Sequence, residues 1–247
     1  MIIFIPPKGY RLKFFGLMLL LGCLFGKKES KPTKTKIMLD EDHYISFVTD
    51  NPPSPKGSLQ IIPFKYHSPA QSYILCETIP LDFMYNIQKK FELLTQNKLS
   101  LPEQIPPFKV GLVHNYLKHA YWTAQTEEEQ AQYDYSGLHN YSLCWIPGIQ
   151  TWIYNVNNSI ALEIAPSYEW DMFNPENNQV IPTFETFISL YKPFAIHIIQ
   201  KEEAQEWLNM ANNYCEIVGQ KFKELTVDKA HELGLSWDRD CNKVILQ

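Results

Sequence analysis

TWIYNVNNSIALEIA, residues 151–165, is the stretch that decides the fold. It holds two β-rich runs, residues 151–156 and 159–165, on either side of two asparagines. Asn157 and Asn158 tolerate the positive φ angles of a tight turn, and β-branched and aromatic residues favour extended backbone. The stretch therefore predicts a β-hairpin. The β-rich run at residues 142–147 predicts a preceding strand of the same antiparallel meander.

The rest of the second half predicts helices and one more strand. Residues 184–190 predict a short helix, PFAIHIIQ at 193–200 predicts a strand, and a long amphipathic helix begins near Glu202. A last short helix is expected at 227–233, with Thr226 as its N-cap and Gly234 at its end. The long helix gathers apolar residues on one face: Ala204, Trp207, Leu208, Ala211, Tyr214, Cys215, Val218 and Phe222.

The first half has the same mixture of elements. Strands are predicted at residues 43–49, 58–66 and 72–79, and a helix at 81–96, where apolar residues recur at helical spacing. Residues 110–122 fit either a strand or a helix. The sequence thus predicts an α+β fold, an antiparallel meander sheet with amphipathic helices packed on one face. We expect residues 38–247 to form a single globular domain.

An apolar run of twelve residues, 14–25, follows a positive cluster of Lys8, Arg11 and Lys13. A membrane-spanning helix needs roughly 20 residues, so the run has the anatomy of a signal peptide. It ends in Leu20-Leu21-Gly22-Cys23, which resembles the lipobox of bacterial lipoprotein precursors. The alternatives are an ordinary signal peptide or a short membrane anchor that happens to contain a cysteine.

The lipoprotein resemblance implies that residues 1–22 are removed and that Cys23 carries the lipid. Several acyl chains anchor a protein stably, since each buried methylene contributes about 0.8 kcal/mol. The globular part would then lie outside the cytoplasm. In bacterial lipoproteins an aspartate directly after the lipidated cysteine is associated with retention at the inner membrane. Leu24 occupies that position here, which implies the outer membrane where the host has one. Residues 23–37, rich in lysine, are expected to be a tether between lipid and domain.

Charge is distributed unevenly along the chain. The formal net charge is −5, and residues 119–191 contain no lysine or arginine but nine acids and many aromatic residues. An acidic surface disfavours nucleic acid as a ligand and suits a basic protein partner, because charge speeds encounter and buried rings supply affinity. The alternative is that acidic bias only promotes solubility.

The loop after residue 166 carries rings and carboxylates in alternation. Aromatic residues in a loop either cover the core or contact a partner. We expect a partner-binding surface there, made of Tyr168, Glu169, Trp170, Asp171 and Phe173.

No nucleophile elbow, phosphate-binding loop or zinc-protease motif is present in the sequence. His114 and His119 would face different ways on a helix, so we expect no metal site there, and no cofactor. One acid–base pair is an alternative catalytic hypothesis: Glu163 and His197 would touch if their strands were neighbours. Such a pair is also common as a structural hydrogen bond.

With Cys23 lipidated, four cysteines remain in an oxidising compartment. Cys76, Cys144 and Cys215 lie in apolar contexts that suit free core thiols. The disulfide candidate is Cys215 with Cys241, which would fasten the C-terminal tail to the long helix.

The layout of the second half, and the run YKPFAIHIIQKEEAQEWL at residues 191–208, resembles small immunity proteins of bacterial toxin systems. The resemblance implies that this chain neutralises a toxin protein by binding it. The sequence therefore favours a lipid-anchored envelope protein that binds a basic protein over an enzyme. The alternatives are an envelope hydrolase that uses Glu163 and His197, and a structural envelope lipoprotein.

Overall fold

The structure is a computed structural model that describes residues 32–168, 182–233, 235–238 and 243–246. The first sheet is an antiparallel meander of β1 (Pro32–Met38), β2 (Tyr44–Asp50), β3 (Ile62–His67) and β4 (Ser72–Thr78), in that order. A short helix, α2 (Pro55–Ser58), lies between β2 and β3, and α3 (Pro80–Thr95) follows β4.

The second sheet is another antiparallel meander, of β5 (Ser142–Ile146), β6 (Ile149–Val156), β7 (Ser159–Pro166) and β8 (Ala195–Ile199). Between β4 and β5 the chain forms α4 (Val110–Thr123), α5 (Glu127–Gln132) and η1 (Ser136–Tyr141). After β7 come α6 (Phe184–Ser189), the long helix α7 (Lys201–Lys223), α8 (Val227–Glu232) and a hairpin of β9 (Leu235–Asp238) and β10 (Lys243–Leu246). The predicted α+β class with an antiparallel meander is confirmed.

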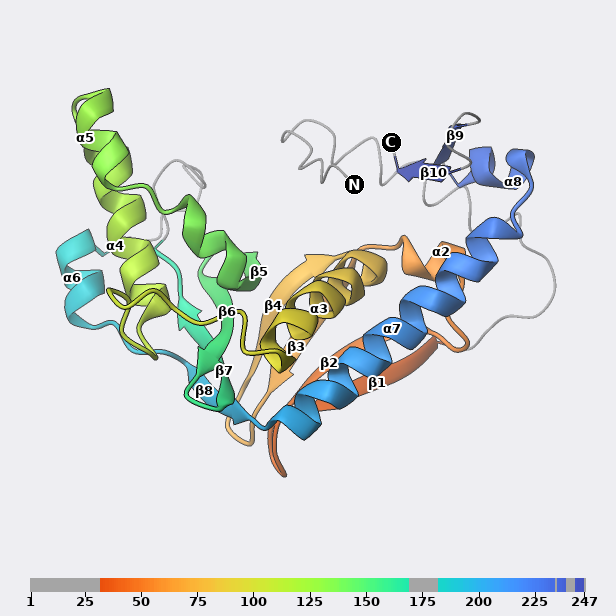
Figure 1. Ribbon diagram of the computed structural model, residues 1–247, viewed down its shortest axis with the longest axis horizontal. Helices are drawn as coiled ribbons and strands as arrows, with labels where there is room; N and C mark the ends of the chain where they lie inside the picture. Colours follow the sequence, from red (N-terminus) through yellow and green to blue (C-terminus); the bar gives the residue numbers. More distant parts are fainter. Residues whose placement is uncertain (1–31, 169–181, 234, 239–242, 247) are drawn as a thin grey trace.

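One hydrophobic core joins the two sheets. In Figure 1, α3 and α7 lie side by side over the first sheet, and the rings of Phe91 and Trp207 stack between them with centroids 5.0 Å apart. The same core contains Leu162 and Ile164 from the second sheet, so α3, α7 and both sheets share one set of buried apolar contacts.

The second sheet is covered on its other face as well. Trp152, Tyr154 and Ala161 form a separate cluster with Val110, beneath α4. Strands β6 and β7 are therefore buried on both faces along nearly their whole length. The expectation that helices pack on one face fits the first sheet, whereas the second sheet is covered on both of its faces.

Most predicted elements are present with small shifts at their ends. Asn157 has φ of 52°, as the predicted tight turn between β6 and β7 requires. The ambiguous residues 110–122 are helical, in α4. Thr226 caps α8 by accepting from the backbone N–H of Lys229, while Gly234 lies outside the described residues.

The predicted tether is wrong from residue 32 onward. Strand β1 pairs with β2 along its whole length, from Pro32 opposite Asp50 to Met38 opposite Tyr44. Threonines and a buried isoleucine, Ile37, alternate with the lysines here and favour an extended strand. Lysines also suit an edge strand, because they prevent pairing with another chain. Residues 23–31 lie outside the described residues.

Within the described residues, no helix has the length and apolar character that a bilayer crossing demands. The residues of the predicted signal peptide and lipobox lie outside the part of the chain that the structure describes.

Candidate functional site

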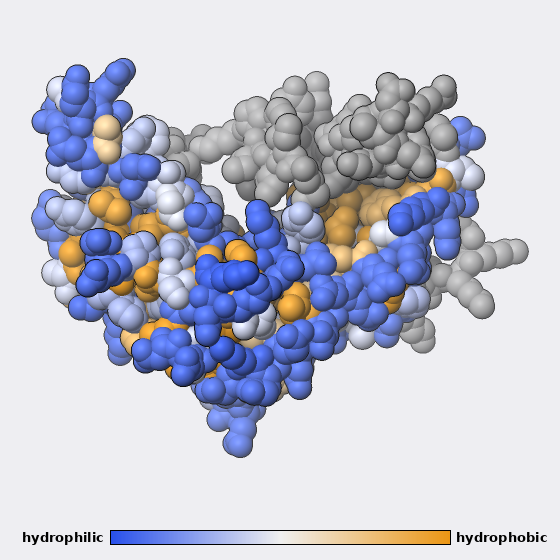
Figure 2. All heavy atoms as spheres, in the orientation of Figure 1, coloured by the Kyte–Doolittle hydropathy of each residue, from blue (hydrophilic) through white to orange (hydrophobic). Residues whose placement is uncertain are grey.

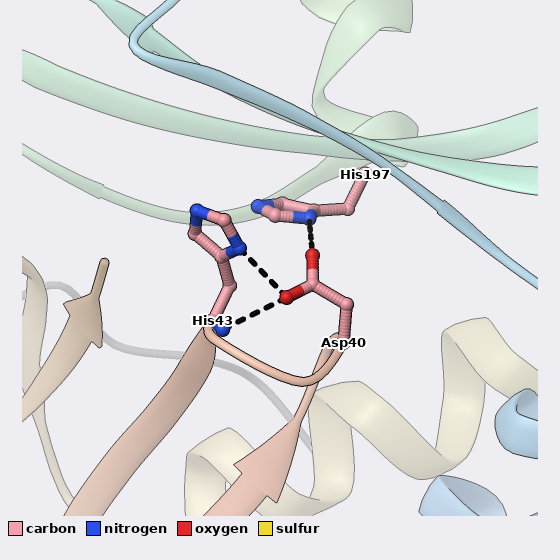
Figure 3. Close-up of side chains that lie close together, drawn as sticks. All are labelled: Asp40, His43 and His197. Atoms are coloured by element: carbon pink, nitrogen blue, oxygen red, sulfur yellow. Dashed lines mark hydrogen bonds and ion pairs between the residues drawn. The ribbon is translucent and has the colours of Figure 1, made fainter. Parts of the chain in front are cut away.

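Asp40, His43 and His197 meet where the turn between β1 and β2 approaches β8 (Figure 3). Oδ1 of Asp40 lies 2.7 Å from Nδ1 of His43, and Oδ2 lies 3.2 Å from Nδ1 of His197. One carboxylate thus holds two imidazoles, and the three side chains offer ligand atoms within 4.8 Å of one another. We call these three residues the His–Asp cluster.

The β1–β2 turn fixes the position of the carboxylate. Oδ1 of Asp40 accepts hydrogen bonds from the backbone N–H groups of Asp42 and His43, both 2.9 Å long, which is the pattern of an Asx turn. The backbone N–H of Leu39 donates to the carbonyl of His43 at 2.8 Å, and the Leu39 side chain is buried in the core. The carboxylate is therefore held by the backbone as well as by the two histidines.

His197 is held from the opposite side. In the register of β8 with β7 it stands across from Leu162, so its side chain turns toward the main core and is only 8% exposed. Its Nε2 lies 3.1 Å from the hydroxyl of Tyr66, which is buried in β3. The rings of His43 and His197 lie 4.9 Å apart between centroids. Both nitrogens of His197 thus have a partner.

The charge states of the cluster follow from burial and hydrogen bonding. Burial raises the pKa of Asp40, but the hydrogen bonds from His43 and Asp42 outweigh burial and lower this pKa to about 2. Burial and the charge of Asp40 raise the pKa of Tyr66 to about 12. Burial lowers the pKa of His197, and the charge of His43 lowers it further, against the opposing effect of Asp40. At pH 7 an ionised carboxylate therefore faces a neutral His197.

A cleft of about 320 Å³ opens beside the cluster. Besides the cluster and Tyr66 its walls are Ser68, Gln71 and residues 194–196. The side chains of Asp40 and His43 are 46% and 30% exposed, so solvent reaches the cluster from this side. Sequence reasoning missed Asp40 and His43. The available signal was the Asp-x-x-His spacing at the start of the strand predicted for residues 43–49.

Glu163 lies on the other face of the second sheet, where it caps a helix. Its carboxylate accepts from the backbone N–H groups of Val110 at 3.2 Å and Gly111 at 3.0 Å, the first residues of α4. The hydroxyls of Tyr154 and Tyr191 also donate to it, at 3.1 and 3.4 Å. The N-cap residue of α4 makes no side-chain capping bond, so a carboxylate from β7 satisfies the helix N-terminus instead.

The predicted pairing of Glu163 with His197 is wrong. Strands β7 and β8 are neighbours as expected, but Glu163 stands opposite Ile196 and His197 stands opposite Leu162. Cross-strand partners share a face, so this register places the acid and the histidine on opposite faces of the sheet. Glu163 is fully buried with four donors around it, which leaves no geometry for the catalytic alternative.

Among the predicted partner-binding residues, only Tyr168 is described. Its backbone N–H donates to Asn115 in α4 at 2.8 Å, and its hydroxyl donates to the carbonyl of Pro182 at 3.2 Å. Its ring packs against Phe184 and Phe187 of α6. Tyr168 thus ties the two described ends of the loop together beside α4. Glu169, Trp170, Asp171 and Phe173 lie outside the described residues.

An acidic surface with exposed rings lies at the end of the molecule that holds α4 and α5. Figure 2 shows hydrophilic residues over α5. Trp122 is 53% exposed, and the acids of the first turn of α5 are all exposed. A hollow of about 410 Å³ between α4 and α5 is lined in part by Glu129 and Tyr133. The members of what we call the α4–α5 surface are Trp122, Glu127, Glu128, Glu129 and Tyr133.

The predicted disulfide joins one described and one undescribed residue. Cys215 is a half-buried free thiol on α7, and Cys241 lies outside the described residues. Cys76 and Cys144 are also free thiols.

Comparison of the chain with protein-family models, with curated proteins and with solved structures finds no match.

Proposed function

We propose that this chain is a lipid-anchored protein of the bacterial cell envelope that binds a basic protein partner. The observation that carries the proposal is the charge of the α4–α5 end. Residues 119–191 contain no lysine or arginine. Within that range, every acid that the structure describes is exposed except the helix-capping Glu163.

Exposed rings beside these acids support a binding role. Trp122, at the end of α4, is followed within one short turn by the three glutamates of α5. Desolvation of an aromatic anchor supplies affinity, whereas the surrounding charges accelerate encounter and select a partner of opposite sign. The α4–α5 surface offers both within a few residues.

Glu169, Trp170, Asp171 and Phe173 are assigned to the proposed surface from the sequence. Tyr168, the last described residue before the segment that holds them, donates its backbone N–H to Asn115 of α4. This segment keeps its sequence-based assignment as part of the partner site.

The anchor is proposed from Leu20-Leu21-Gly22-Cys23 and the positive cluster before it, with Cys23 as the lipidated residue. A toxin is the partner class that suits both the resemblance at residues 191–208 and the acidic surface. A toxin that acts on nucleic acid carries the positive charge that its substrate requires, and an acidic inhibitor complements that charge.

The test is capture of a partner by the full chain in its native membranes, with chemical cross-linking and mass spectrometry. The surface variant combines Trp122→Ala with Glu127→Lys and Glu128→Lys. The matched control combines Trp145→Ala with Glu206→Lys and Glu216→Lys, because these residues are also exposed and the change of charge is the same.

We expect one basic protein to be cross-linked in equal amount to the wild-type chain and the control, and to be lost with the surface variant. Retention by the surface variant would contradict the proposed site. Cys23→Ala tests the anchor separately: we expect release from the membrane fraction and loss of the lipid mass, and an unmodified Cys23 in the wild-type chain would refute the anchor.

A further inference from the structure

We propose that Asp40, His43 and His197 bind one divalent transition-metal ion, with zinc as the ion that these ligands suit best. The inference is independent of the proposed partner surface, which lies on other elements. Two imidazoles and one carboxylate form a three-ligand set that leaves room for water or another ligand at a zinc ion.

The ligand atoms already converge. The Nδ1 atoms of His43 and His197 approach the two oxygens of a single carboxylate. Around four-coordinate zinc, with bonds of about 2.0–2.1 Å, ligand atoms lie about 3.3 Å apart. The two contacts of Asp40, at 2.7 and 3.2 Å, lie close to this spacing, and all three ligand atoms lie within 4.8 Å of one another.

The surrounding residues orient the ligands as a metal site requires. Nε2 of His197 lies 3.1 Å from the buried hydroxyl of Tyr66 and can donate its proton to that oxygen, which leaves the Nδ1 lone pair for the metal. The Asx turn holds Asp40 through the backbone of Asp42 and His43. Tyr66 is thus a positioning residue and not a ligand.

Access and charge also favour a cation. The cleft reaches the cluster from solvent, and none of the described residues that line it is a lysine or an arginine. Ser68 and Gln71 also line the cleft and would give a metal-bound water polar neighbours. A bound ion would join the β1–β2 turn of the first sheet to β8 of the second.

The test is titration of the untagged, chelator-treated chain with zinc, followed by calorimetry and by competition with a chromogenic chelator. Cobalt(II) as a second probe gives visible absorption bands that report the coordination number. The ligand variants are Asp40→Asn and His43→Gln, chosen because both side chains are partly exposed. The control is His231→Gln, an exposed histidine in α8.

We expect one zinc ion per chain in the wild type and in the control. The ligand variants should bind more than about 100-fold more weakly, and Tyr66→Phe about tenfold more weakly through loss of the outer contact to His197. Circular dichroism confirms that each variant is folded before titration.

A wild-type chain that binds no zinc would show that the cluster is a hydrogen-bonded group only, and would overturn the inference. Equal binding by the wild type and both ligand variants would place the ion on other residues, such as the free cysteines, and would overturn it equally.

Discussion

Glu163 connects the second sheet to α4, and its replacement by glutamine measures that connection. The carboxylate accepts from two backbone N–H groups, of Val110 and Gly111, and from two tyrosine hydroxyls. Glutamine has the same shape but only one oxygen, so its amide group must face at least one of the N–H donors. That donor is buried in the wild-type chain, with Val110 fully excluded from solvent.

The expected loss of stability follows from this count. A buried donor left without an acceptor costs about 1–3 kcal/mol, so we expect Glu163→Gln to lower the free energy of unfolding by that amount. For a domain of this size, each 1 kcal/mol corresponds to a decrease in Tm of about 2–4 °C. Urea and thermal unfolding followed by circular dichroism measure both quantities.

The matched control is Glu206→Gln, an exposed glutamate on α7, which should change stability by less than about 0.5 kcal/mol. Equal stability of the two variants would refute the reasoning that Glu163 holds the N-terminus of α4.

The pH dependence of this stability has a definite sign. Burial raises the pKa of Glu163 above its ordinary 4.5, although hydrogen bonds from Gly111 and Tyr154 oppose the increase. Because the folded chain then binds the proton more tightly than the unfolded chain, the contribution of Glu163 is complete below pH 4.5 and is lost as the pH rises through the raised pKa. The stability difference between wild type and Glu163→Gln should therefore decrease from acid to alkaline pH, and an increase would show that the hydrogen bonds to the carboxylate outweigh the effect of burial.

Two further substitutions test the packing of the second sheet. Gly111→Ala should lower the free energy of unfolding by about 1–3 kcal/mol, because the added Cβ would lie 2.9 Å from Cβ of Ala165. The control is Gly137→Ala, which has open space around it and should leave the free energy of unfolding unchanged in the same assay. Asn157→Ala should lower the free energy of unfolding by about 1 kcal/mol, because Asn157 has φ of 52°, which alanine adopts less readily. Asn157→Gly should keep the stability of the wild-type chain. Identical unfolding midpoints for the two variants would show that the positive φ does not constrain this position.

The elements that sequence could predict are those whose residues act locally. The turn at Asn157 and the apolar face of α7, with Trp207 and Val218, depend on neighbours a few residues away, and both are present. Strand β1 was hidden because its lysines suggested a solvated tether, while the pairing that orders it comes from β2.

The sites depended on contacts that local pattern does not specify. Strand alternation placed Glu163 and His197 on definite faces of their own strands, but the relative faces depend on register, and a shift of one residue reverses every side chain. Asp40 and His43 meet His197 only because the two sheets share one core, over a separation of more than 150 residues. The excess of acidic residues at 119–191 can be seen in the sequence. The exposure of Trp122 beside α5 can be seen only in the structure, because it depends on how α4 packs.

Hydrogen–deuterium exchange of the full chain, alone and in a non-covalent complex with the basic partner that cross-linking identifies, tests the central proposal most directly. If the partner binds the α4–α5 surface, amide exchange in residues 116–133 should slow in the complex. High salt should reverse this effect, since charge attraction contributes to the complex. Unchanged exchange in residues 116–133, with protection confined to other elements such as the edge strand β8, would contradict it.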